Sequence, residues 1–262
     1  MSVADEEPAL LGLAPVAPDR TVAYGPHPDQ LVDVYAPRAG DGGRAAVRGP
    51  LVVLLHGGFW RAAYDRRHLS PLAAELAGQG MPVALAEYRR VGAGGGAPQT
   101  FEDVAAAIGA AHAALAQTAA DPAVVLVGHS AGGHLALLAA ARPGTPVTRV
   151  LAVSPVADLA RAHELGLSDG AVAELLGPGP GLPGRLAAAD PARHPPAGVP
   201  VTILHGTDDP DVPVELSRRY AARSPGTTDL RELPGVGHYA PVTPGSPSCH
   251  TLFRCLSRTC ST

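Results

Sequence analysis

Short apolar runs bounded by glycine and proline recur along this chain and alternate with segments of helical periodicity. The runs Leu51–Leu55 and Val124–Val127 are wholly aliphatic, which is the pattern of strands buried on both faces of a parallel sheet. Eight strands are predicted, over Thr21–Tyr24, Leu31–Tyr35, Leu51–Leu55, Val83–Glu87, Val124–Val127, Arg149–Val153, Val201–Leu204 and Asp229–Leu233.

Helical segments lie between the later strands. One helix is predicted around four apolar residues that share a face, Phe101, Val104, Ile108 and Leu115, and two more over Leu135–Ala141 and Val214–Ala222. Strands that alternate with helices predict an α/β protein whose mostly parallel, eight-stranded sheet is covered by helices on both faces. The first two runs lie close together in sequence and predict an antiparallel hairpin.

Two segments depart from this alternation within what otherwise reads as one domain over residues 1–262. Residues 154–199, between strands six and seven, hold two short helical patterns, with Ser168 expected to cap a helix over Gly170–Leu176. We interpret this segment as a small cap over the site; a long surface loop is the alternative. In residues 241–262, a final helix is predicted from Cys249, Leu252, Phe253 and Leu256, which would leave Cys255 and Cys260 exposed.

Composition narrows the class of protein. A length of 262 residues with 46% hydrophobic and 17% charged residues suits one globular α/β domain. The net charge is −4 and the basic residues are scattered, so neither nucleic acid nor a membrane is an expected partner, and the oligomeric state is open. All 20 basic residues are arginine, which excludes a Walker-type P-loop, a pyridoxal Schiff base and a Ser–Lys dyad.

The ends of the chain bear on its location. The sequence begins with an acidic segment where a signal peptide would be basic, and no apolar run approaches the ~18 residues that cross a bilayer. The three cysteines lie in the last fourteen residues and do not form a disulfide framework. They are interpreted as incidental, with redox sensing or metal binding as the alternative. A cytoplasmic location is therefore predicted.

The most informative motif is Gly128-His129-Ser130-Ala131-Gly132, which directly follows an apolar run and precedes an alanine-rich helical pattern. Gly-x-Ser-x-Gly between a strand and a helix is typical of a nucleophile elbow, in which glycines permit a turn too tight for side chains. Such a turn would raise the Ser130 hydroxyl to the rim of the sheet.

A serine nucleophile requires a base, and the base requires a carboxylate; in this architecture both follow the serine in chain order. After the strand Val201–Leu204 come three acids, of which Asp209 fits the His-Gly-x-x-Asp-x-x-Val-Pro register best. Asp208 and Asp211 are the alternatives. A carboxylate just past the end of a parallel strand reaches the rim where Ser130 is expected.

The predicted base is His238. It follows the eighth strand within Pro234-Gly235-Val236-Gly237-His238, where glycines and a proline favour a tight loop at the end of a strand. His250, in the C-terminal segment, is a distant second choice.

A fourth motif, His56-Gly57-Gly58-Phe59-Trp60, follows the strand Leu51–Leu55. Acyl transfer places negative charge on the former carbonyl oxygen, and each preorganised N–H donor there contributes ~10²–10³ in rate. The predicted oxyanion donors are the backbone N–H groups of Gly58, Phe59 and Ala131. Trp60 and Phe59 are expected to wall an apolar substrate pocket, with core packing as the alternative, and His56 to anchor the loop.

The remaining histidines show no metal-ligand spacing, so neither a metal site nor a cofactor is predicted. His129 and His134, which flank the elbow, are expected to pack or hydrogen-bond locally.

These four ordered motifs resemble the α/β-hydrolase superfamily over about Leu51 to Tyr239. Within it, His-Gly-Gly-Phe-Trp with Gly-His-Ser-Ala-Gly-Gly-His is similar to the esterase branch that includes kynurenine formamidase-like enzymes; hormone-sensitive-lipase-like esterases typically have a third glycine at the place of Phe59. The resemblance implies a cofactor-free serine hydrolase with Ser130, Asp209 and His238 as triad. It also implies that the segment Glu87–Arg90 supports the site.

The leading hypothesis is hydrolysis of small carboxylic esters through an acyl-enzyme. The alternative is aryl formamide hydrolysis of the N-formylkynurenine type, which would use the same groups with a very small acyl pocket. A non-catalytic binding protein on this fold is the hypothesis from a different class, and a prolyl peptidase is disfavoured because the chain has no room for a propeller domain.

Overall fold

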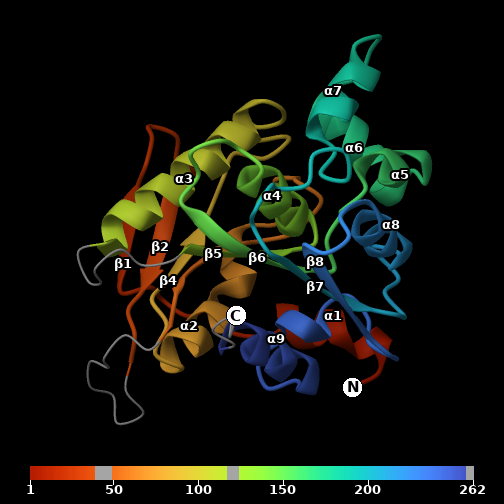
Figure 1. Cartoon of the computed structure of the whole chain (residues 1–262). Coiled ribbons are helices and arrows are strands. Elements are labelled where there is room, and N and C mark those ends of the chain that lie inside the picture. Colours follow the sequence, from red (N-terminus) through yellow and green to blue (C-terminus); the bar gives the residue numbers. More distant parts are fainter. Residues whose placement is uncertain (39–48, 117–123, 258–262) are drawn as a thin grey trace.

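The computed structural model describes residues 1–38, 49–116 and 124–257 (Figure 1). Its centre is an eight-stranded sheet in the order β1-β2-β4-β3-β5-β6-β7-β8. β1 pairs antiparallel with β2, and β2 pairs antiparallel with β4, whereas every later pairing is parallel. The predicted fold class and the antiparallel hairpin are therefore confirmed.

The strands lie close to their predicted ranges, and successive residues along a buried strand face two different cores. The strands are β1 (Arg20–Ala23), β2 (Leu31–Tyr35), β3 (Leu51–Leu55), β4 (Val83–Ala86), β5 (Val124–His129), β6 (Val147–Val153), β7 (Val201–Gly206) and β8 (Thr228–Leu233). In β3, Leu51, Val53 and Leu55 face one hydrophobic core, while Val52 and Leu54 face the other.

Helices cover both faces of the sheet (Figure 1). The first core lies under α3 (Gln99–Ala116), α4 (Ala131–Ala140) and α8 (Glu215–Arg223). The second lies under α1 (Val3–Leu11), α2 (Ser70–Gly78) and α9 (Pro247–Ser257), so the N-terminal and C-terminal helices share one face. Helices α1 and α2 are absent from the sequence-based predictions. No helix in the described ranges is both long and apolar enough to span a bilayer.

Residues 154–199 contain three helices, α5 (Leu159–Glu164), α6 (Leu167–Leu176) and α7 (Leu182–Ala189). Ser168 does not cap a helix as expected: its φ is +48° within the kinked start of α6, and its hydroxyl accepts a hydrogen bond from Arg61. That bond joins this segment to the loop after β3. The interpretation of residues 154–199 as a cap on a single domain stays a prediction.

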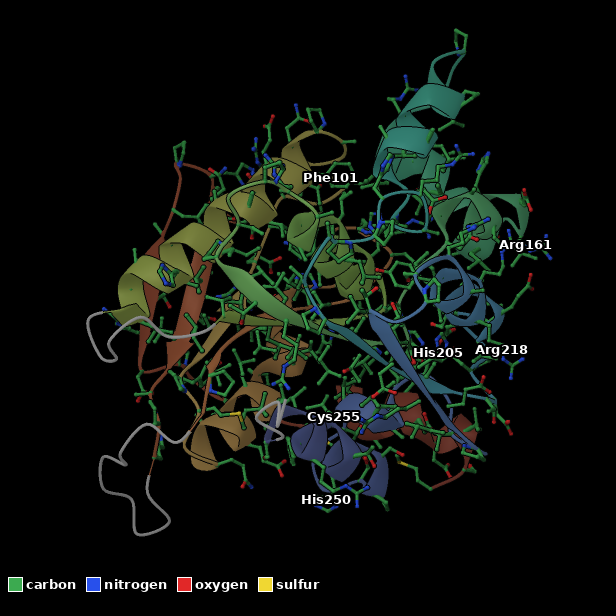
Figure 2. The ribbon with its side chains drawn as sticks, in the orientation of Figure 1. Phe101, Arg161, His205, Arg218, His250 and Cys255 are labelled. Atoms are coloured by element: carbon green, nitrogen blue, oxygen red, sulfur yellow. The ribbon has the colours of Figure 1, made fainter. Side chains whose placement is uncertain are left out.

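Helix α9 corrects one expectation about the cysteines. Cys255, labelled on α9 in Figure 2, is buried as Cys249 is, because the buried face of α9 is wider than the four residues of the predicted stripe. The Sγ of Cys255 accepts a hydrogen bond of 3.2 Å from Arg231 on β8. Cys260 lies outside the described residues.

Candidate active site

Ser130 forms the sharp turn between β5 and α4. Its φ of +57° and ψ of −119° are a strained conformation for a residue with a Cβ. The surroundings fix this turn, because the Ser130 N–H donates to the Val153 carbonyl at 2.9 Å and the Ser130 carbonyl accepts from Gly133 and His134 at the start of the helix. The backbone therefore has the geometry of a nucleophile elbow.

The glycines around Ser130 are required by close backbone approaches. A Cβ at Gly128 would lie within 3.0 Å of the Gly132 carbonyl, and a Cβ at Gly132 would lie within 3.0 Å of the carbonyls of Leu55 and His56. The elbow thus packs directly against the end of β3, where the second motif begins.

We expect Gly132→Ala to lower the free energy of unfolding by about 3 kcal/mol or to prevent folding, because backbone must move to make room for the methyl group. The matched control is Gly109→Ala on α3, where an added Cβ would meet nothing within 4 Å. That change should raise stability by about 0.5–1 kcal/mol through helix propensity. Urea denaturation measures both, and equal effects would contradict the packing described for the elbow.

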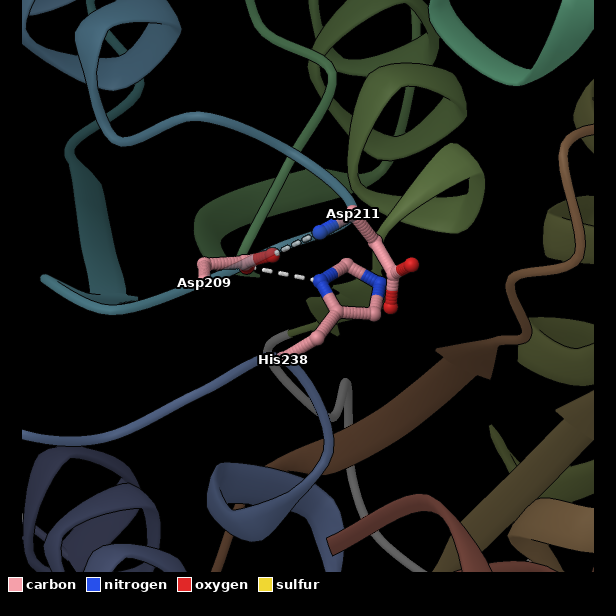
Figure 3. A group of neighbouring side chains, drawn as sticks. All are labelled: Asp209, Asp211 and His238. Carbon is pink, nitrogen blue, oxygen red and sulfur yellow. Dashed lines mark hydrogen bonds and ion pairs between the residues drawn. The ribbon is translucent and has the colours of Figure 1, made fainter. Parts of the chain in front are cut away.

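Asp209 and His238 lie on the loops that follow β7 and β8, and they contact each other. His238 Nδ1 lies 2.7 Å from Asp209 Oδ2, with the carboxylate fully buried and the imidazole nearly so (Figure 3). The two loops are tied together by backbone hydrogen bonds, from Thr207 N–H to the Leu233 carbonyl and from Asp208 N–H to the Val236 carbonyl, both 3.0 Å.

The surroundings of Asp209 keep it ionised. Its Oδ1 accepts hydrogen bonds from the N–H groups of Asp211 and Val212 at 2.9 and 2.8 Å, and His205 Nε2 lies 3.3 Å from its Oδ2. Burial alone would raise the pKa of the Asp209 carboxyl, but the hydrogen bonds from His205 and His238 hold that pKa well below its ordinary value. A carboxylate held in this way can fix the tautomer of His238.

The other two acids of this loop do not contact His238 in the same way. Asp208 is exposed and accepts a hydrogen bond from the Thr207 hydroxyl at 2.8 Å. Asp211 extends from the loop toward the opposite edge of the His238 ring and lines the cavity described below (Figure 3).

Ser130 and His238 line one cavity. They are linked through His129, whose ring centroid lies 4.6 Å from that of His238 and whose Nε2 donates to the His238 carbonyl at 3.0 Å. The Ser130 hydroxyl and the His238 ring, both within the described ranges, make no hydrogen bond to each other. Catalytic hydrogen bonds in unliganded enzymes are commonly long and tighten when substrate binds.

The loop after β3 lies on the other side of Ser130. Gly58, Phe59 and Trp60 all have positive φ values, of +106°, +47° and +60°. Within the described chain, the N–H groups of Gly58 and Phe59 make no hydrogen bond, and both residues line the cavity. Ala131 is the first residue of α4, so its N–H also has no helical acceptor. These are the donors predicted for an oxyanion.

His56 holds this loop in place. Its Nδ1 donates to the Gly57 carbonyl at 2.8 Å, its Nε2 lies 2.7 Å from Glu87 Oε1, and its ring stacks on Tyr88 at 4.5 Å. Burial would raise the pKa of the Glu87 carboxyl, but His56 and Arg90 lower it. His56 is buried and does not line the cavity, and the segment Glu87–Arg90 lies behind the loop.

The prediction that Trp60 walls the substrate pocket is corrected. Trp60 is fully buried in the first core, 5.2 Å from the His134 ring, and does not line the cavity. Its ring packs in the core with that of His134, which is the alternative of core packing. Phe59, which precedes it, is only partly buried and does line the cavity.

Sequence reasoning missed one residue, Glu6 on α1. Its carboxylate is buried and accepts three backbone hydrogen bonds, from Gly237 at 2.8 Å, Tyr239 at 3.0 Å and Ala240 at 2.9 Å. Those N–H groups bracket His238, so the N-terminal helix anchors the histidine loop from 231 positions away in sequence. The available signal was that Glu6 lies one helical turn before the apolar Leu10 and shares its face.

We expect Glu6→Gln to lower the free energy of unfolding by about 2–4 kcal/mol and to lower kcat, because an amide cannot accept three charge-assisted hydrogen bonds. The control is Asp5→Asn on the same helix, where the exposed carboxylate bonds Ser2 only. Thermal melts and ester turnover measure the two effects. Equal behaviour of the two variants would contradict an anchoring role for Glu6.

The cavity has a volume of about 310 Å³, which suits a small ligand. Its lining includes the predicted site residues Gly58, Phe59, Ser130 and His238. It also includes residues from α1 and from the loops after β3, β7 and β8, among them Glu7, Leu11, Tyr64, Asp211 and Tyr239.

The described ranges hold one group of side chains with metal-ligand character, and it coincides with this site. Asp209, Asp211 and His238 each offer one ligand atom, all within 4.8 Å of one another (Figure 3). In this group, Asp209 and His238 already satisfy each other by the 2.7 Å bond. The absence of a metal or cofactor stays a prediction.

Comparison with known proteins identifies the family of this chain. The model of the BD-FAE family matches residues 32–223, which span β2 to α8 and include Ser130 and Asp209. The chain belongs to the BD-FAE family. His238 lies beyond the matched range of the BD-FAE model, and so does the helix that bears Glu6.

A curated relative of this BD-FAE protein is an uncharacterized protein of Mycobacterium tuberculosis, 34% identical over 199 residues. The match covers 74% of this chain and 64% of the relative, so the chain spans less than two thirds of the length of the curated relatives it matches.

Solved structures share the fold. Esterase B of Lactobacillus rhamnosis has a TM-score of 0.77 at 23% identity, covering 97% of this chain and 90% of its own. Esterase 2 of Thermogutta terrifontis has a TM-score of 0.70 at 23% identity, covering 94% of both chains. A truncated carbohydrate esterase from gut microbiota has a TM-score of 0.75 at 18% identity, covering 94% of this chain and 98% of its own. The predicted α/β-hydrolase fold of this BD-FAE protein is thus confirmed.

Proposed function

We propose that this protein is a serine hydrolase that cleaves small carboxylic esters through an acyl-enzyme. The observation that carries the proposal is the position of the buried Asp209–His238 pair on the cavity that Ser130 lines from a strained elbow. Ser130, Asp209 and His238 follow the carboxyl ends of β5, β7 and β8, which supports the proposed roles of nucleophile, orienting carboxylate and base.

In the proposed reaction, the Ser130 oxygen attacks the ester carbonyl carbon while His238 Nε2 accepts the hydroxyl proton. The carbonyl electrons move to the oxygen, whose negative charge is stabilised by the N–H groups of Gly58, Phe59 and Ala131. When the carbonyl re-forms, the alcohol leaves with the proton from His238. Water then attacks the acyl-enzyme with His238 again as base, which releases the acid and restores Ser130.

The cavity volume of about 310 Å³ supports a small substrate. The structural neighbours support the same class: Esterase B of Lactobacillus rhamnosis is described with a tributyrin phosphonate, and esterase 2 of Thermogutta terrifontis with bound propionate and phosphonylated by sarin. An amide substrate of the aryl formamide type is the second candidate, supported by the motif resemblance alone. A cytoplasmic location and a catalysis free of metal and cofactor remain part of the proposal.

Purified protein tests the proposal with p-nitrophenyl acetate, p-nitrophenyl butyrate and N-formylkynurenine. We expect kcat/KM for the acetate to exceed that for the formamide. A marked preference for the formamide would favour the second candidate, and the absence of turnover of all three would favour a non-catalytic binding protein.

A further inference from the structure

We propose that the preferred substrate is an ester whose alcohol part carries a cationic ammonium group. The inference rests on the proposed function, because it assigns the substrate class of the same cavity. Its basis is the set of side chains that line the cavity but have no part in the proposed reaction.

The alcohol part has a defined side of the cavity. The leaving oxygen takes its proton from His238, so the alcohol must lie next to that imidazole. Asp211 and Tyr239 line the cavity on this side, with Asp211 drawn next to the outer edge of the His238 ring (Figure 3). Glu7 and Tyr64 line it as well, from α1 and from the loop after β3.

Two carboxylates of this wall have no counter-ion. Among the described residues, neither Glu7 nor Asp211 forms an ion pair, whereas Asp209 pairs with His238 and Glu174 pairs with Arg61. Both charges act on Tyr239: burial raises the pKa of its hydroxyl, and Asp211 and Glu7 raise it further. Both carboxylates also line the same cavity of about 310 Å³, so both can act on a ligand bound there.

The positive charge of Arg61, which lines the cavity, is already neutralised. The guanidinium of Arg61 makes two hydrogen bonds to Glu174, of 2.7 and 3.0 Å, and two more to Ser168. His68 also lines the cavity, but burial lowers its pKa to about 4, so it is uncharged at neutral pH. The wall thus presents a net negative charge to a ligand.

Aromatic rings accompany the two acids. Tyr64 is 41% exposed at the cavity, and Tyr239 and Phe59 are partly exposed there. Carboxylates combined with aromatic faces are the usual recognition elements for ammonium groups, through charge and cation–π attraction. The two carboxylates would repel an anionic alcohol, and they would give a neutral one no attraction between opposite charges.

The kinetic experiment compares two thioesters of the same shape, acetylthiocholine and its uncharged carbon analogue 3,3-dimethylbutyl thioacetate, by thiol release. We expect kcat/KM to favour the cationic substrate by about 10-fold at low ionic strength, and the ratio to fall as NaCl is raised. Glu7→Gln and Asp211→Asn should each lower the ratio about 3-fold, because each removes one charge.

Two further variants sharpen the test. Glu174→Gln leaves the Arg61 charge uncompensated and should lower the ratio too, although Glu174 does not line the cavity. Glu102→Gln removes an exposed charge on α3 that lies outside the cavity lining, and should leave the ratio unchanged. A ratio at or below 1 in the unmodified protein, or one that none of these variants changes, would overturn the inference.

A binding measurement separates this inference from the proposed function. Calorimetry of phenyltrimethylammonium with the Ser130→Ala variant should give a Kd that weakens about 3-fold when Glu7 or Asp211 is also neutralised. Cation binding without hydrolysis of any ester would defeat the proposed function, and with it the substrate class inferred here, while leaving a cation-binding cavity. Ester hydrolysis without cation binding would defeat the inference and leave the proposed function standing.

Discussion

Replacing Ser130 with alanine is expected to lower kcat/KM for p-nitrophenyl acetate by about 10⁴- to 10⁶-fold, because alanine lacks the hydroxyl that would attack the ester. The fold should be unaffected, since alanine keeps the Cβ and therefore the same strain at φ +57°. Initial rates of purified protein, with circular dichroism as the folding check, measure the effect.

The control for this loss is Ser154→Ala. Ser154 also has a positive φ, of +44°, and is buried at the end of the neighbouring strand β6, but it does not line the cavity. We expect that variant to retain most of the turnover. Comparable loss in both variants would indicate a general structural effect and count against Ser130 as nucleophile.

Replacing Asp209 with asparagine is expected to lower kcat by about 10³- to 10⁴-fold. The amide keeps the shape of the carboxylate and can still accept from the Val212 N–H, but its NH₂ group turned toward His238 Nδ1 would favour the wrong imidazole tautomer. The same change at the exposed neighbour Asp208 should have less than about a 2-fold effect.

This pair of variants decides between the carboxylates that the sequence leaves open. Both changes remove one negative charge from the same loop, so the loss of a charge cannot by itself account for a difference between them. Steady-state kinetics over a range of pH measures it. A larger loss in the Asp208→Asn variant would show that Asp208, and not Asp209, orients His238.

The sequence predicted the sheet well because its strands are aliphatic runs with clear boundaries. The ranges Leu31–Tyr35 and Leu51–Leu55 match β2 and β3 at both ends. The order of strands across the sheet could not be predicted from these runs. β4 lies between β2 and β3, although it follows β3 in the chain after a helix. That helix, α2, is a short alanine-rich segment with weak periodicity, and it was not predicted.

The sequence could predict those site residues whose side-chain chemistry and place at the end of a strand both indicated the same role. Asp209 and His238 follow strands whose carboxyl ends share one edge, so their loops had to meet near Ser130. Trp60 was misassigned because the sequence does not reveal which of two adjacent aromatic residues turns into the core. Glu6 was missed because its role appears only when α1 packs beside the loop of His238.

In the proposed reaction, Ser130 is a nucleophile that His238 activates. The most direct measurement is labelling with a fluorophosphonate, followed by mass spectrometry of the digested protein. We expect one covalent adduct on the peptide that contains Ser130, and labelling slower by several orders of magnitude in the His238→Ala variant. An adduct on another residue, no adduct, or an unchanged rate in that variant would contradict it.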